Sequence, residues 1–145
     1  MAGLEERSHV LTVPTRGKGF VDFTRAVAAW LDGIGAQGGL LTVFVTHTSA
    51  SLTIQENADP NVRVDLLDAL ERLAPEDHDY AHHEEGPDDM PSHIKSMLTS
   101  VNLSIPVREG AMARGNWQGI DLVEQRAAPH QRQVVLSYIG RVSRG

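Results

Sequence analysis

The chain has no cysteine among its 145 residues, and this absence restricts the chemistry that it can perform. Disulfide bonds and thiolate metal ligands are both excluded, so any transition-metal site must use histidine and carboxylate side chains. Aromatic residues make up only 5% of the chain, so the core must rest on valine, leucine, isoleucine and alanine. No apolar run reaches membrane-spanning length and no signal peptide is recognisable, so we expect a cytoplasmic protein without a membrane partner.

The composition is that of an ordinary globular protein, with 41% hydrophobic and 22% charged residues. Its length suits one domain with a real hydrophobic core, and we expect a single domain over residues 1–145. The formal net charge of −6 argues against a nucleic-acid partner, because such binding needs a basic surface. A small anionic ligand remains compatible with this charge, since a phosphate site needs only a few local cations.

Strands are predicted where short apolar runs are β-branched or alternate with polar residues. These runs cover residues 8–13, 40–46, 51–55, 101–107, 120–123 and 132–139. The run at 40–46 is continuous and apolar, which is typical of a buried central strand. It leads directly into a polar cluster that begins at His47, and such clusters at strand ends are where sites tend to be built.

Two helices are predicted from apolar periodicity and from capping residues. Apolar side chains recur every three or four residues from Phe23 to Ile34, with Asp22 as a plausible N-cap and glycines at the exit. A second helix is predicted over residues 60–73, because Asp59 precedes a proline at the first helical position.

A third, shorter helix is predicted over residues 91–98, with Asp89 as its cap. Strands and helices do not alternate strictly along the chain, which favours an α+β fold over a doubly wound one. We therefore expect compact, β-sandwich-like mixed sheets with two or three short helices.

Three of the seven histidines lie in the polar stretch at residues 80–95, which leads into this third helix. His82 and His93 flank Asp88 and Asp89, and His47 follows the predicted central strand. Three histidines with one open coordination position are the usual architecture of a catalytic zinc-like centre. We therefore predict a divalent ion, zinc or magnesium or manganese, as the cofactor. The alternative is a solvated polar loop whose histidines only face water.

Several neighbouring polar residues are candidates for binding a small phosphorylated substrate. Thr48 and Ser49 offer hydroxyl groups beside the first histidine, although turn capping would also explain them. Asn57 precedes a helix N-terminus, where anions bind readily, and Arg63 lies one turn inside that helix. Lys95 is a candidate partner for a phosphate, or else an ordinary exposed lysine.

Three segments in this order resemble the signatures of the YjbQ family, also called the secondary thiamine-phosphate synthase family. The first is HTSASLTIQENADP at residues 47–60. The second, at residues 80–96, combines Tyr80-x-His82 with EGPDDMPSHIKS. The third is GNWQGI from residue 115, with Glu124-x-Arg126 after it. The resemblance extends from about residue 40 to about residue 135.

This resemblance implies a β-sandwich-like α+β fold that assembles as a homotrimer. It also implies a histidine-rich site near subunit contacts that holds a metal or an anion. His47, His82 and His93 would be the metal ligands, and these three histidines with the nearby Asp89 would be the catalytic residues. A weak thiamine-phosphate synthase activity is implied as well. That reaction joins a pyrimidine pyrophosphate to a thiazole phosphate and releases pyrophosphate.

The sequence departs from the family pattern at two positions. Asn116 replaces the usual threonine, and Gln125 stands where some members have histidine. Neither departure changes one of the predicted metal ligands. Three functions stay open from the residues: a metal-assisted enzyme acting on a small phosphorylated substrate, a metal-dependent hydrolase of a phosphate or other ester, and a non-catalytic trimeric protein that binds a metal or an anion.

Overall fold

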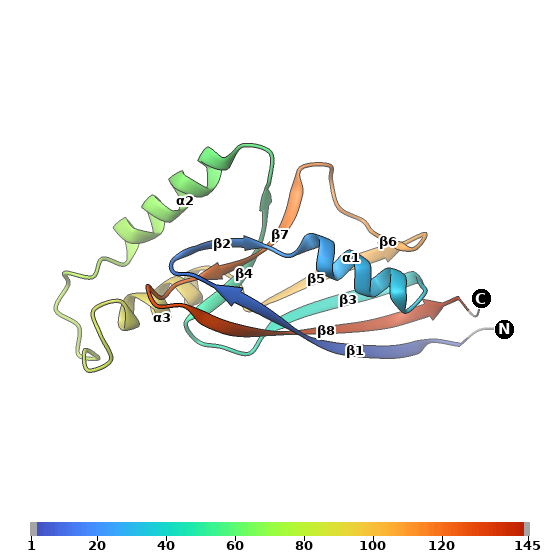
Figure 1. Ribbon diagram of the computed structural model, residues 1–145, viewed down its shortest axis with the longest axis horizontal. Helices are drawn as coiled ribbons and strands as arrows, with labels where there is room; N and C mark the ends of the chain where they lie inside the picture. Colours follow the sequence, from blue (N-terminus) through green and yellow to red (C-terminus); the bar gives the residue numbers. More distant parts are fainter. Residues whose placement is uncertain (1–2, 144–145) are drawn as a thin grey trace.

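The structure, a computed structural model, describes residues 3–143 and has an α+β fold, as the sequence predicts (Figure 1). In the described part of the chain, eight strands and three helices follow one another in this order: β1 Glu5–Thr15, β2 Gly19–Asp22, α1 Thr24–Gly33, β3 Ala36–Val45, β4 Ala50–Glu56, α2 Pro60–Leu73, α3 Asp89–Leu98, β5 Asn102–Arg108, β6 Ala111–Met112, β7 Gln118–Glu124 and β8 His130–Val142.

The strands form two sheets, one of five strands in the order β1-β8-β3-β5-β6 and one of three in the order β2-β7-β4. The pairing is antiparallel throughout residues 3–143, where we expected mixed sheets. Connections between antiparallel neighbours can be short, so a chain of this length completes both sheets with only three helices.

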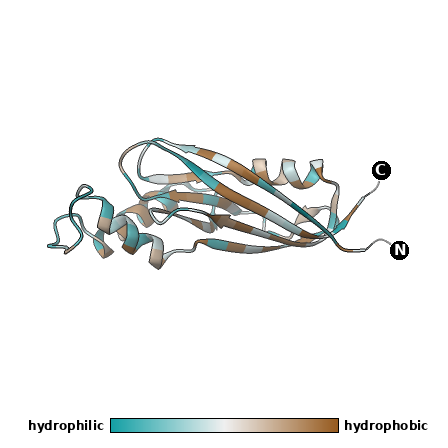
Figure 2. Ribbon diagram, turned by 90° about the horizontal axis from the view of Figure 1, so that it is seen from below, coloured by the Kyte–Doolittle hydropathy of each residue, from teal (hydrophilic) through white to brown (hydrophobic). Residues whose placement is uncertain are grey.

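The core lies between the two sheets and under α1. The large sheet contributes residues such as Leu41, Val43 and Leu136, and the small sheet contributes Leu52 and Leu122, all of them fully or almost fully buried. Along β8 buried residues alternate with more exposed ones from Arg132 to Tyr138, which is the pattern of a strand with one covered face. Hydrophobic residues follow the strands, whereas the connection between α2 and α3 is largely hydrophilic (Figure 2).

The start of β3 and the short strand β2 were not predicted, for identifiable reasons. β3 begins at Ala36 and runs through Gly38 and Gly39, which we expected to lie in a loop. A Cβ atom at Gly39 would collide with the main chain of β8, so the glycine permits close strand pairing rather than marking an exit. The four-residue strand β2 was not predicted, because it contains too few residues to show a pattern.

The helix caps follow the predictions at one of three sites. Asp59 is the N-cap of α2 and accepts a hydrogen bond from the main-chain nitrogen of Asn61 at 2.9 Å. Asp22 is not the N-cap of α1, because Phe23 occupies that position, although the Asp22 carboxylate accepts from the main-chain nitrogen of Thr24 at 2.9 Å. Asp89 is not a cap, because α3 begins at this residue and its carboxylate turns toward other side chains.

Within residues 3–143, no helix combines the length and apolar character that a membrane crossing requires.

Candidate functional site

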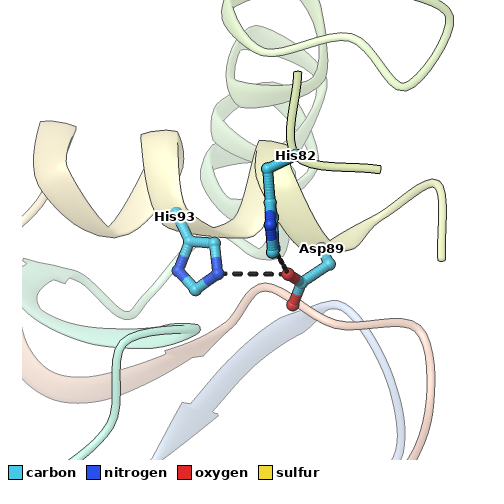
Figure 3. Close-up of side chains that lie close together, drawn as sticks. All are labelled: His82, Asp89 and His93. Atoms are coloured by element: carbon cyan, nitrogen blue, oxygen red, sulfur yellow. Dashed lines mark hydrogen bonds and ion pairs between the residues drawn. The ribbon is translucent and has the colours of Figure 1, made fainter. Parts of the chain in front are cut away.

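His82, Asp89 and His93 form a cluster at the N-terminus of α3 (Figure 3). Oδ2 of Asp89 lies 2.6 Å from Nε2 of His82 and 3.2 Å from Nε2 of His93. One donor atom from each residue lies within 4.8 Å of the other two, which is close enough for one ion to bind all three. Asp89 is buried, but its two histidine neighbours are partly exposed, so the cluster is open to solvent.

Local structure explains why these side chains meet. Asp89 and His93 are four residues apart on α3, so they project from the same face of the helix. His82 comes from the connection that precedes the helix and reaches the same carboxylate oxygen. The spacing of His82 and His93 in the sequence does not place them on one face of a helix. Only the folded connection before α3 brings the two rings together.

The second nitrogen of His93 fixes the orientation of this ring. Nδ1 lies 3.0 Å from the main-chain oxygen of Thr48, which can only accept a hydrogen bond. Nδ1 must therefore carry the proton, and in the neutral ring Nε2 presents a lone pair. That lone pair faces a carboxylate oxygen of Asp89, so two acceptors meet unless a proton or a cation lies between them.

Arg126 holds the acidic part of the site in place. Its Nε donates to Oδ2 of Asp88 at 3.0 Å, its Nη1 to Oδ1 of Asp89 at 2.5 Å, and its Nη2 to the carbonyl of Glu85 at 3.0 Å. The Asp88 carboxylate also accepts from the main-chain nitrogen of Ala127 at 2.8 Å. One guanidinium thus ties the connection before α3 to the chain that follows β7.

These contacts also determine the charge on Asp89. Burial by itself raises the pKa of this carboxyl group, but the hydrogen bond from His82, the contact with His93 and the positive charge of Arg126 outweigh it. The pKa of Asp89 therefore lies below its usual value, and the group is an anion at neutral pH. An ionised carboxylate is the form that a metal ion requires.

His47, predicted as the third metal ligand, does not belong to this cluster. Its Nε2 accepts a hydrogen bond from the main-chain nitrogen of Gln133 on β8, at 2.8 Å, so the ring joins the end of β3 to the neighbouring strand. Burial and the positive charge of Arg132 lower the pKa of His47, and the ring is neutral at pH 7.

Ser49 and Lys95, predicted to bind substrate, are engaged within the protein. The Ser49 hydroxyl accepts from Nη2 of Arg132 at 3.0 Å, beside a buried ion pair between that arginine and Glu124. Lys95 is 1% exposed and forms an ion pair with Glu71 of α2. Its side chain therefore fastens α3 to α2. Thr48 contributes its main-chain oxygen to His93, and not its hydroxyl.

Asn57 and Arg63 lie in a different part of the molecule. Arg63 donates to the buried carboxylate of Asp121 at 2.7 Å and approaches Asp22 at 3.4 Å, and both it and Asn57 line a cavity beside α1. Burial, despite the opposing charge of Arg63, raises the pKa of Asp121 to about 6. The predicted substrate-binding set is thus divided between two places.

Two polar residues with structural importance were not assigned a role from the sequence. Arg126 and Glu124 lie in the third segment of the family resemblance, and this position was the only signal in the sequence that they matter. Trp117, immediately before β7, is 64% exposed. The turn that carries it projects beyond the end of β7, where no sheet covers it.

The donors in the cluster fit a divalent transition metal. Two imidazole nitrogens and one carboxylate oxygen suit zinc, iron or manganese, whereas magnesium prefers oxygen ligands. Three protein ligands also leave a position open for water or substrate. A hollow of about 420 Å³, lined by His82, Tyr80 and Met90 among others, adjoins the cluster and offers room for such a ligand.

Comparison with known proteins was made for sequence and for structure. A family model described as "UPF0047 protein YjbQ-like" matches residues 9–141. A UPF0047 protein of Synechocystis sp. is 45% identical over 97% of this chain and 97% of its own length. The UPF0047 protein YjbQ of Salmonella typhimurium is 40% identical over 90% of this chain and 95% of its own.

Solved structures with the same fold come from bacteria and archaea. A conserved hypothetical protein of Thermus thermophilus is 38% identical with a TM-score of 0.78, covering 93% of this chain and 99% of its own. A YjbQ-like protein of unknown function from Sulfolobus solfataricus has a TM-score of 0.88 over 96% of this chain and 100% of its own. Its 22% identity makes this second likeness one of fold alone.

Proposed function

Because this chain belongs to the YjbQ-like family (UPF0047), we propose that it is a metal-assisted enzyme acting on a small phosphorylated substrate. The observation that carries the proposal is the approach of Nε2 of His93 to Oδ2 of Asp89, at 3.2 Å. Both atoms are acceptors when the ring is neutral, and a shared cation converts their repulsion into binding. His82 supplies the third ligand.

The reaction that the family resemblance favours is the condensation of thiamine-phosphate synthesis. The thiazole nitrogen attacks the pyrimidine methylene carbon, a C–N bond forms, and the C–O bond to pyrophosphate breaks with its electron pair leaving on the pyrophosphate. No protein nucleophile is required. His82, Asp89 and His93 would hold a divalent ion, and this ion would supply Lewis-acid stabilisation of the departing charge. The chain itself orients the ligands, through the Thr48 carbonyl on His93 and through Arg126 on Asp89.

This proposal is tested by assaying the condensation with protein freed of any contaminating synthase. We expect His82→Ala and His93→Ala to abolish turnover while the circular dichroism spectrum stays unchanged. His9→Ala is the matched control, because that exposed ring on β1 is not part of the cluster and does not line the hollow beside it. Full activity in both cluster variants would exclude the site.

A metal-dependent hydrolase is the second candidate, and the ligand set favours it specifically. Two histidines and one carboxylate are the protein ligands of several zinc hydrolases, which activate a water in the open position. Phosphate esters and lactones with added zinc or manganese test this function. Hydrolysis without condensation selects the hydrolase, and metal binding without either reaction selects a non-catalytic binding protein.

We also propose that the chain assembles as a homotrimer. The outer face of the large sheet supports this, because it leaves apolar side chains exposed on three adjacent strands. Val10 on β1 and Phe44 on β3 both pair with Val135 of β8, and Leu40 pairs with Ile139. Val10 and Ile139 are each more than half exposed. A sheet face of this character suits contact with another copy of the chain.

A further inference from the structure

A second candidate site lies at the other end of β7 from the histidine cluster. It is a cavity of about 760 Å³ between β1, the start of α1, the start of α2 and the turn before β7. We call it the arginine cavity, because Arg25, Arg63 and Arg114 line it together with Asn57 and Asn116. Its volume falls in the range of sites that bind small molecules.

The charges around this cavity are not balanced. Asp22 is the one acidic residue among the lining residues, against three arginines. Its carboxylate accepts from the nitrogen and the hydroxyl of Thr24, and it also lies 3.4 Å from Arg63. Arg63 is further neutralised by Asp121. In a chain with a net charge of −6, a local excess of positive charge directs anions to this place.

Two of the arginines keep their charge available. In residues 3–143 no carboxylate forms an ion pair with Arg25 or Arg114. Arg114 donates one hydrogen bond, from Nη1 to the carbonyl of Gln118 at 2.9 Å, which holds its stem against the turn. Guanidinium groups present several donors in a fixed fork, and this geometry matches the oxygens of a phosphate.

The wall of the cavity also has hydrogen-bonding capacity that the protein does not use. The side-chain amides of Asn57 and Asn116, which both line the cavity, make no hydrogen bond within residues 3–143. An amide group offers two donors and an acceptor, so these side chains can bond to a polar ligand in the cavity.

Gly119 brings the polar residues of the cavity close to β7. A Cβ atom at this position would lie 2.8 Å from Oδ2 of Asp22 and 3.1 Å from Cβ of Asn57. Any larger residue would therefore push both side chains away from the strand. The glycine therefore lets Asp22 and Asn57, which both line the cavity, lie close to β7.

We propose that the arginine cavity binds the phosphate group of a small phosphomonoester, with Arg25 and Arg114 as its charged partners and Asn57 and Asn116 contacting the remainder. None of the residues that line the cavity belongs to the histidine cluster or lines the hollow beside it. The cavity is therefore a site separate from the histidine cluster, and the proposal does not rest on metal binding there.

Isothermal titration of metal-free protein with inorganic phosphate, glycerol 3-phosphate and ribose 5-phosphate tests the proposal. We expect saturable binding of an ester at one site per chain, weakened at least about tenfold in Arg25→Met, which removes one charged partner. Arg114→Met should act in the same direction. Arg108→Met is the matched control, because this exposed arginine on β5 is not a lining residue.

Four results would overturn the proposal. The first is the absence of saturable binding, and the second is equal affinity in wild type and Arg25→Met. The third is loss of binding in His93→Ala, which would place the anion at the histidine cluster. Equal affinity for inorganic phosphate and both esters would contradict the phosphomonoester assignment and identify a site for free phosphate.

Discussion

His93 lies with its Nδ1 atom 3.0 Å from the main-chain oxygen of Thr48, so the chain that follows β3 orients a ring on α3. This contact gives the ring one tautomer when it is neutral and directs the Nε2 lone pair at Asp89. The residues come from segments far apart in the sequence, and the contact is made by a carbonyl group. The contact therefore does not depend on which side chain occupies position 48.

Arg126 is expected to act on the cluster without being a ligand. Its guanidinium contacts both Asp88 and Asp89, and partners of this kind typically change metal affinity about 10- to 100-fold. We predict that Arg126→Met weakens zinc binding by about that factor, measured by competition with a chromogenic chelator. Arg108→Met serves as the control, and unchanged affinity in Arg126→Met would contradict the role.

The ion pair between Glu124 and Arg132 is buried and bidentate, with Nε–Oε1 at 2.8 Å and Nη2–Oε2 at 2.5 Å. Arg132→Met would leave a buried carboxylate with Thr15 as its remaining side-chain hydrogen-bond donor. We predict a loss of about 3–5 kcal/mol in the free energy of unfolding, measured with urea at pH 7. The double variant Glu124→Gln with Arg132→Met should lose less, and an equal or larger loss would refute this explanation.

Asp121 should make stability fall as pH rises. Burial raises its folded-state pKa to about 6, so the unfolded chain releases this proton first, near pH 4. The stabilising contribution of the protonated group is complete below about pH 4 and is lost as pH rises through about 6. Asp121→Asn should therefore gain stability relative to wild type across this window, by roughly 2–3 kcal/mol, and then stay level.

Urea unfolding of both proteins at a fixed protein concentration, from pH 4 to pH 8, measures this difference. Because the comparison is between two proteins at each pH, carboxyl groups that titrate alike in both cancel. A difference that does not change with pH would show that Asp121 titrates normally.

The outer sheet face should be needed for assembly. A glutamate in place of Val10 puts a charge among the apolar residues of β1, β8 and β3, and we expect Val10→Glu to convert a trimer to a monomer. Val64→Glu on α2 is the control, since Val64 is also an exposed apolar residue, 61% accessible, but lies away from this face. Light scattering gives the mass directly, and a wild-type monomer would contradict the proposal.

The fold class and most elements follow from local patterns in the sequence. The helix over 60–73 is predicted by Asp59, Pro60 and its apolar spacing, and the structure confirms it. The start of β3 could not be predicted in this way. Its glycines are typical of a loop when seen alone, and only the close approach of β8 makes them suitable for a strand.

The candidate site was predictable in part. His82, Asp89 and His93 meet, as their density in one polar stretch suggested. His47 could not be placed from the sequence, because a residue at a strand end can face either a site or the adjacent strand. Here the main-chain nitrogen of Gln133 determines its direction. The burial of Lys95 could likewise not be predicted from the sequence, since its partner Glu71 belongs to another helix.

The most direct test of the account is a titration of chelator-treated protein with Zn²⁺, followed by calorimetry, in wild type and His93→Ala. We predict one saturable site per chain in the wild type and its loss in the variant, while His83→Ala binds as the wild type does. Equal binding in wild type and His93→Ala, or no saturable binding at all, would contradict a metal site at His82, Asp89 and His93.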